Sequence, residues 1–93
     1  MLSFLPKTPK EVQILLKDKF KKQRKLLKIT QQELAIKSGV SLGSIKRFEQ
    51  SGQISLESLL KIAFVLDCLE DFEKVCEREE EKYKSIEEII NET

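Results

Sequence analysis

The stretch from Gln31 to Gln50, QQELAIKSGVSLGSIKRFEQ, decides the fold of this chain. Thr30 stands before it and Glu33 follows Thr30 by three residues, a capping-box spacing that predicts a helix beginning at Gln31. Gly39 can take the left-handed backbone conformation that ends a helix, and Ser41 can cap the next one. The stretch therefore predicts two short helices joined by a tight turn.

The apolar residues of this stretch indicate which side of each helix faces the core. Leu34 and Ala35 are predicted to point inward, and Ala35 is small where the second helix must cross closely. Ile45 and Phe48 are three residues apart in the second helix, so they share one face. The faces left available to a partner carry Leu42, Gly43, Ser44, Lys46 and Arg47.

Cap and apolar signals on both sides of this stretch predict further helices. Thr8 and Glu11 have the spacing of a capping box, with Pro9 at the first position of a long first helix. Its apolar stripe is predicted to consist of Val12, Leu15, Leu16, Phe20 and Leu27. Ser55 is predicted to cap a fourth helix. The buried face of that helix is predicted to consist of Leu56, Leu59, Leu60, Ala63 and Leu66.

The last part of the chain predicts a fifth helix from Glu70 to Lys82 and a short final helix capped by Ser85. The inward residues of the fifth helix are predicted to be Phe72, Val75 and Cys76. Only 3 Gly and 2 Pro occur, and aromatics make up 6%, which favours helices over strands. We predict an all-α fold of about five helices plus a short C-terminal helical extension. The predicted domain boundary separates residues 1–69 from an acidic helical extension in residues 70–93.

A net charge of +1 conceals an uneven distribution of charge along the chain. Residues 1–66 hold thirteen Lys or Arg against five Asp or Glu, whereas residues 67–93 hold four against eleven, so the two parts carry +8 and −7. A basic part that contains two helices and a turn is typical of a phosphate-binding surface. The acidic end suits a protein partner or solvent.

Several classes of protein are disfavoured by the sequence. There is no His, no glycine-rich phosphate loop and no metal-spaced Cys cluster, so we expect no enzyme, cofactor or metal. The apolar run at Leu2, Phe4 and Leu5 is too short for a signal segment, and no stretch approaches a membrane span, so we expect a cytoplasmic protein. Cys68 and Cys76 are expected to be reduced packing residues, with a disulfide as the alternative.

These residues resemble a known family. The pattern TQQELA, SGVS and SIKRFE, followed by ISLESLLKIAFVL, is similar to the helix-turn-helix of phage Cro and repressor proteins and their bacterial relatives, over residues 20–69. The resemblance implies a lambda-repressor-like fold and a transcriptional regulator that binds DNA. It further implies a repressor that binds a palindromic operator as a homodimer.

The resemblance also implies which residues contact DNA. The positions that match base-facing ones are Leu42, Gly43, Ser44, Lys46 and Arg47. Arg47 can donate two hydrogen bonds to one guanine, whereas Lys46 fits a phosphate contact equally well. Gln31 and Gln32 at one helix N-terminus, and Ser41 at the next, are predicted to hold phosphates. Readout through DNA shape is the alternative to base contacts on this small helix face.

Two further matches and two departures qualify the resemblance. Arg24 and Glu49 match positions that pair between the first and third helices, and Arg24 can also project toward the DNA backbone. Leu42 and Gly43 stand where many members have Gln or Asn, and Lys28 stands where Gly often closes the first helix. We expect the first departure to alter base readout and the second to cost a little stability.

A surplus of apolar residues predicts a contact surface near the acidic part of the chain. As a set, Ile62, Phe64, Val65 and Leu69 are predicted to form a dimer or partner contact, although each taken singly fits a core position. The final helix holds three more apolar residues, which we expect to be buried against this chain, a second protomer or a partner. They are Ile86, Ile89 and Ile90.

A second function follows from part of the same resemblance. The version KRFEQSGQISLESLL is similar to a subgroup of antitoxins found beside HipA-type kinase toxins. Such a protein neutralises its partner toxin and uses DNA binding to regulate its own operon. The sequence therefore leaves two functions open, an operator-binding repressor and an antitoxin with a kinase-like toxin partner.

Overall fold

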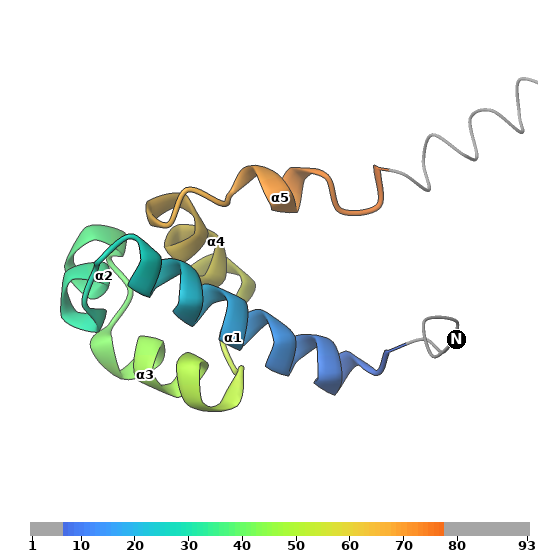
Figure 1. The fold of residues 1–93 in the computed structure, drawn as a ribbon, viewed down its shortest axis with the longest axis horizontal. Helices are drawn as coiled ribbons and strands as arrows, with labels where there is room; N and C mark the ends of the chain where they lie inside the picture. Colours follow the sequence, from blue (N-terminus) through green and yellow to red (C-terminus); the bar gives the residue numbers. More distant parts are fainter. Residues whose placement is uncertain (1–6, 78–93) are drawn as a thin grey trace, which may run out of the picture.

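The computed structural model describes residues 7–77, and this part of the chain is helical (Figure 1). Its helices are α1 (Pro9–Leu26), α2 (Gln31–Ser38), α3 (Leu42–Ser51), α4 (Leu56–Val65) and α5 (Glu70–Glu73). The predicted all-α fold is confirmed for these residues, which contain no strand. Among them, no helix combines the length and the apolar character that crossing a bilayer requires.

Side-chain caps begin the four longer helices where the sequence predicts them. Thr30 and Glu33 form the complete capping box of α2, each side chain accepting from the other residue's backbone N–H at 3.0 Å. Ser41 and Ser55 cap α3 and α4 by accepting from the N–H three residues on. Thr8 caps α1 through the N–H of Glu11, which is half of the predicted box. Local caps thus fix the starts of these four helices.

The core lies where α3 packs against α1 and α2, and where α2 packs against α4. Phe20 of α1 is central, because its ring meets that of Phe48 edge to face with centroids 5.6 Å apart and lies 6.1 Å from that of Phe72. The buried apolar residues are Phe20, Leu34, Val40, Ile45, Phe48, Leu59, Ile62, Ala63 and Leu66. The unit formed by α2, the turn and α3 therefore packs against α1 through α3 and against α4 through α2.

The predicted apolar stripe of α1 is only partly buried. Phe20 is buried and Leu16 packs against the core, but Val12, Leu15 and Leu27 are exposed. Val12 and Leu15 lie in the N-terminal half of α1, whose first turns extend past α3 and α4 (Figure 1), and Leu27 is the C-cap residue at the other end of the helix. Periodicity indicates the side of a helix that is apolar, but it does not indicate how far the neighbouring helices reach along it.

The buried face of α4 differs from the prediction at Leu56 and at Ile62. Ile62, predicted to belong to a contact surface, is 1% exposed and belongs to the core with Leu59, Ala63 and Leu66. Leu56, predicted to lie on the buried face, is exposed. The assignment of Ile62 to a dimer or partner surface is therefore wrong.

The fifth helix is much shorter than predicted. It spans Glu70–Glu73, and the chain then turns, with Cys76 at a positive φ of 67° that no regular helix allows. Phe72 packs against the core as predicted, whereas Val75 and Cys76 are exposed rather than inward. The rest of the predicted fifth helix and the final helix with Ile86, Ile89 and Ile90 lie outside the described residues.

Both cysteines are free thiols, but the predicted packing role holds only for Cys68, because Cys76 is exposed. Cys68 packs against the core, where burial, followed by the nearby carboxylates of Asp71 and Asp67, raises the pKa of its thiol. A thiol with a raised pKa is a poor nucleophile, which fits a packing role. Within residues 7–77, no group of three or more Cys, Asp or Glu side chains is arranged to hold a metal ion.

We predict that Lys28→Gly stabilises the protein. Lys28 ends α1 with a positive φ of 57°, and its N–H donates to the carbonyl of Lys25 at 3.0 Å. A residue with a Cβ pays about 1 to 2 kcal/mol in this conformation, while glycine loses more freedom on folding. We expect a net gain of about 0.5 to 1 kcal/mol in the free energy of unfolding, measured with urea. Lys28→Ala is the control, and equal stability of the two variants would contradict the prediction.

Candidate nucleic-acid interface

One face of α3 is anchored in the core and the other is open. Ile45, Phe48 and Glu49 are buried against α1 and α2, whereas Gly43, Ser44, Lys46 and Arg47 are exposed and Leu42 is half-buried. The structure thus brings together all five residues predicted from the α3 sequence. A Cβ built on Gly43 would meet no atom within 4 Å, so packing inside the protein does not require glycine there.

The N-terminus of α3 is organised by two serines. The Ser41 hydroxyl accepts from the Ser44 N–H at 3.1 Å and donates to the Ser44 hydroxyl at 2.8 Å. Both residues are exposed, so the first turn of α3 presents hydroxyls and backbone N–H groups to solvent. Such a turn can bind an anion through its N–H groups and the helix dipole.

Arg47 is held by a residue that sequence reasoning missed. Its Nε and Nη2 donate to the Oε1 of Gln53 at 3.1 and 2.6 Å. Gln53 lies in the turn between α3 and α4, and both side chains are exposed. The Arg47 side chain is therefore oriented along the open face of α3 before any partner binds.

A buried network connects α1, α2 and α3 directly behind this face. Nε of Arg24 donates to Oε2 of Glu49 at 2.7 Å and Nη2 donates to Oε1 at 3.0 Å, which confirms the predicted ion pair. Nη1 of Arg24 donates to the carbonyl of Ile29 at 2.9 Å, and Nε2 of Gln31 donates to Oε1 of Glu49 at 3.0 Å. Arg24 is 8% and Glu49 7% exposed, so the network fixes the angle between helices away from solvent.

The charged state of Glu49 is favoured by this network. Burial alone raises the pKa of the Glu49 carboxyl, but the hydrogen bonds from Arg24 and Gln31 outweigh it, and the charges of Arg24 and Lys21 act in the same direction. The pKa of Glu49 therefore lies below its ordinary value of 4.5. Gln31 was predicted as a phosphate contact, and its side-chain amide is instead half-buried and bound to Glu49.

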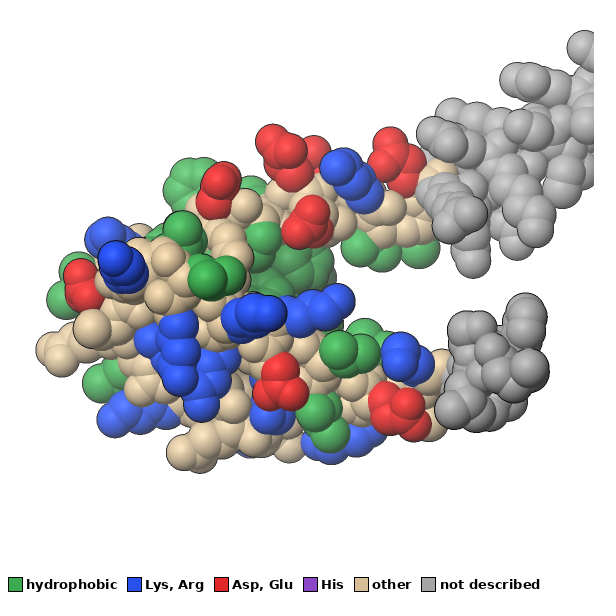
Figure 2. Space-filling model, viewed as in Figure 1, with side chains coloured by type: hydrophobic (Ala, Val, Ile, Leu, Met, Phe, Trp, Pro, Cys, Tyr) green, Lys and Arg blue, Asp and Glu red, His purple; other side chains and the backbone are tan. Residues whose placement is uncertain are grey.

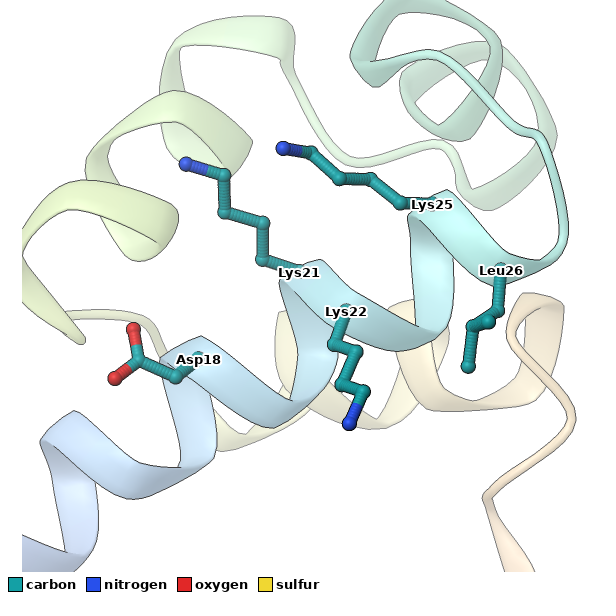
Figure 3. A pocket seen from close by; sticks show the side chains of 5 residues that line it. All are labelled: Asp18, Lys21, Lys22, Lys25 and Leu26. Atoms are coloured by element: carbon teal, nitrogen blue, oxygen red, sulfur yellow. The ribbon is translucent and has the colours of Figure 1, made fainter.

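Lysines on the second half of α1 add positive charge beside α3. Lys21 and Lys25 extend to the same side of α1, while Lys22 extends the other way (Figure 3). Lys21 is close enough to Glu49 of α3 for its charge to act on that carboxyl. Gln32 at the start of α2 is exposed, as a phosphate contact requires. Exposed basic and polar groups are thus present on α1, α2 and α3.

Charge separates across the molecule as the sequence predicts. Basic side chains gather over α1 and the neighbouring body, whereas acidic ones gather along the α5 segment (Figure 2). The acidic residues of that segment are Asp67, Glu70, Asp71, Glu73 and Glu77. A polyanion such as DNA is attracted to the first region and repelled by the second.

An apolar groove of about 420 Å³ lies between the end of α2, α4 and the residue that precedes α5. Phe64, Val65 and Leu69 line it together with Leu60, and Lys37 and Lys61 stand at its edges. Phe64 is 72% exposed, which is unusual for a phenylalanine in a folded domain. Three of the four described residues predicted to make a contact surface therefore lie together, the exception being the buried Ile62.

Comparison with known families supports the interpretation of these helices. A family model described as Helix-turn-helix matches residues 20–72, more than half of the chain. The matched region runs from Phe20 to Phe72, two residues whose rings lie 6.1 Å apart. Comparisons with curated proteins and with solved structures give no match.

Proposed function

The chain belongs to the helix-turn-helix family of lambda-repressor-like DNA-binding transcriptional regulators, and on this premise we propose that it represses transcription by binding a palindromic operator as a homodimer. The observation that carries this proposal is the open face of α3, which presents Ser44, Lys46 and Arg47 while Ile45 and Phe48 anchor the opposite face. A recognition helix needs this combination of a rigid back and a polar front.

In this proposal α3 enters the major groove of the operator. The guanidinium of Arg47 donates two hydrogen bonds to O6 and N7 of a guanine. Leu42 contacts a thymine methyl, and Gly43 allows the helix backbone to approach the bases closely. Lys46 binds a phosphate at the groove edge. Because Leu42, Gly43 and Ser44 at the front of α3 offer few hydrogen-bonding groups, readout combines base contacts with DNA shape.

The remaining polar groups hold the DNA backbone. Gln32 and the first-turn N–H groups of α2 bind one phosphate, and Ser41 at the start of α3 binds another. Lys21 and Lys25 of α1 bind phosphates beside α3. Arg24 is assigned to orienting the helices, because its N–H groups already bind Glu49 and Ile29.

The apolar groove is the proposed dimer contact. Phe64, Val65 and Leu69 supply an exposed apolar surface on a domain with a small core, for which a second copy is a natural supplement. Two copies related by a twofold axis place their α3 helices about 34 to 36 Å apart, on successive major grooves of one face of the duplex.

Phe64→Asp is expected to convert the dimer to a monomer. A carboxylate in the centre of an apolar contact loses its hydration on association, which costs several kcal/mol. Light scattering at micromolar concentration is expected to give a dimer for the natural protein and a monomer for the variant. Leu26→Asp, on an exposed apolar residue of α1 outside the groove, is the control and should remain dimeric. A natural protein that is monomeric both free and on operator DNA would contradict the dimer.

The antitoxin function is a second candidate, favoured by the exposed groove and the acidic segment. The acidic extension, residues 70–93, is the proposed partner contact, apart from Phe72, which packs on the core. A kinase-like toxin would cover apolar surface that solvent otherwise contacts. Co-purification with the product of the neighbouring coding region would favour this function. Silencing of a reporter gene that carries the bound DNA site, in cells that lack such a partner, would favour repression alone.

A further inference from the structure

The turn between α3 and α4 is fixed by contacts with α1 and with the end of α3. Nε2 of Gln13 donates to the carbonyl of Gly52 at 2.9 Å, and Gly52 has a φ of 81°. A Cβ at Gly52 would lie 3.1 Å from the Gln13 backbone carbonyl oxygen and side chain, so the approach depends on glycine. This contact holds the residue that follows, Gln53, at a defined place beside α3.

The position of Gln53 is further set by Ser51. The backbone N–H of Gln53 donates to the Ser51 hydroxyl at 3.2 Å, and that hydroxyl donates to the carbonyl of Arg47 at 2.7 Å. The side-chain oxygen of Gln53 then accepts from Nε and Nη2 of Arg47. Hydrogen bonds from α1 and from Ser51 therefore fix the turn, and Gln53 of this turn binds the guanidinium of Arg47.

The way in which Gln53 holds Arg47 leaves one edge of the guanidinium free. A guanidinium has five N–H groups, and Gln53 takes one from Nε and one from Nη2. The Nη1 and Nη2 end keeps a parallel pair of N–H groups. That pair matches the spacing of O6 and N7 on the major-groove edge of guanine.

We propose that Gln53 is a specificity-determining residue that positions Arg47 for a guanine without reading a base itself. The inference rests on the proposed readout by Arg47. Ordering a long side chain at an interface costs free energy, and a side chain that is already ordered avoids part of this cost. Loss of the Gln53 acceptor is therefore expected to weaken the guanine preference about three- to tenfold.

Competition binding of the full chain to its selected operator tests this role. Gln53→Met removes the acceptor and keeps the length of the side chain, whereas Gln53→Glu keeps an acceptor. Each is measured alone and combined with Arg47→Ala, on the operator and on a duplex in which the base pair sensed by Arg47 is replaced. Thermal unfolding of each variant establishes that the fold is retained, as expected because Gln53 is exposed.

The expected result is a specific pattern of discrimination. Gln53→Met should reduce the preference for the guanine about three- to tenfold in the natural background and leave it unchanged in the Arg47→Ala background. Gln53→Glu should retain the preference while weakening both duplexes equally, because its carboxylate repels DNA. If Gln53→Met has no effect on the preference once Arg47 is replaced, Gln53 acts through Arg47. A merely structural role or a phosphate contact of Gln53 would not produce this dependence on Arg47.

Other results would overturn the inference in distinguishable ways. If Arg47→Ala removes the guanine preference but Gln53→Met keeps it, the positioning role fails and the readout by Arg47 stands. If Gln53→Met weakens all duplexes equally, Gln53 is a backbone contact. If Arg47→Ala leaves the preference unchanged at every base pair, the proposed readout fails first and the positioning role fails with it.

Discussion

Replacing Arg24 by Met is expected to lower the free energy of unfolding by about 3 to 5 kcal/mol, because it leaves the Glu49 carboxylate buried without its charged partner. A domain of this size has a total stability of about 5 to 15 kcal/mol, so the variant should be close to unfolding at room temperature. The carbonyl of Ile29 also loses the hydrogen bond that it accepts from Arg24, which contributes to the same effect.

Urea unfolding measures this effect, and the surface pair Lys17–Asp18 supplies the control. Its atoms lie 3.0 Å apart, but Asp18 is largely exposed, so Lys17→Met should cost less than about 1 kcal/mol. Replacing Arg24 and Glu49 together by Met should restore much of the stability lost in Arg24→Met. A loss below about 1 kcal/mol for Arg24→Met would show that the pair does not organise the fold.

The same network predicts how stability depends on pH. The folded-state pKa of Glu49 lies below its unfolded value near 4.5, so its contribution is present above that pH and is lost as the pH falls through the folded value. In Glu49→Gln this contribution is absent at every pH. The acid loss of stability should therefore be shallower in that variant than in the natural protein, and identical acid profiles would contradict the assignment.

The affinity for DNA is expected to fall steeply with salt. Three lysines in each protomer, Lys21, Lys25 and Lys46, are proposed to neutralise phosphates, which makes six in the dimer. Each neutralised phosphate contributes about −0.9 to the slope of log affinity against log salt, for a total near −5. Between 50 and 200 mM salt, the affinity should fall by about 10³-fold.

Titration by fluorescence anisotropy measures this slope. Lys21→Ala removes two phosphate contacts from the dimer, so the slope should become shallower by roughly 2 and binding to operator and random DNA should weaken alike. Lys74→Ala, in the acidic part of the molecule, is the control and should leave the slope unchanged. An affinity independent of salt would contradict binding through this surface.

Much of the fold could be predicted because its signals are local. The starts of α2 and α3 depend on Thr30, Ser41 and the residues three positions later, all of which are adjacent in sequence. Ile62 could not be placed correctly, because its burial depends on how α4 is rotated against α2. The short α5 is likewise followed by a positive φ angle at Cys76, a residue type for which no sequence signal predicts that conformation.

In the candidate site, too, some features could be predicted from the sequence and others could not. The open residues of α3 and the pair of Arg24 with Glu49 follow motif positions, and the structure places them as expected. The hydrogen bonds of Gln31 to Glu49 and of Arg47 to Gln53 follow no pattern, because exposed or half-buried amides have many possible partners. The partner that each of these side-chain amides binds is determined by the three-dimensional course of the turns.

Selection of bound duplexes from a random DNA library tests the central claim most directly. The proposed function predicts enrichment of an inverted repeat whose half-site centres lie about 10 base pairs apart, with a guanine preference in each half that Arg47→Ala abolishes. Binding to the enriched site should exceed binding to unrelated DNA by at least about 10³-fold. Recovery of unrelated sequences, with equal affinity for all of them, would contradict a sequence-reading α3.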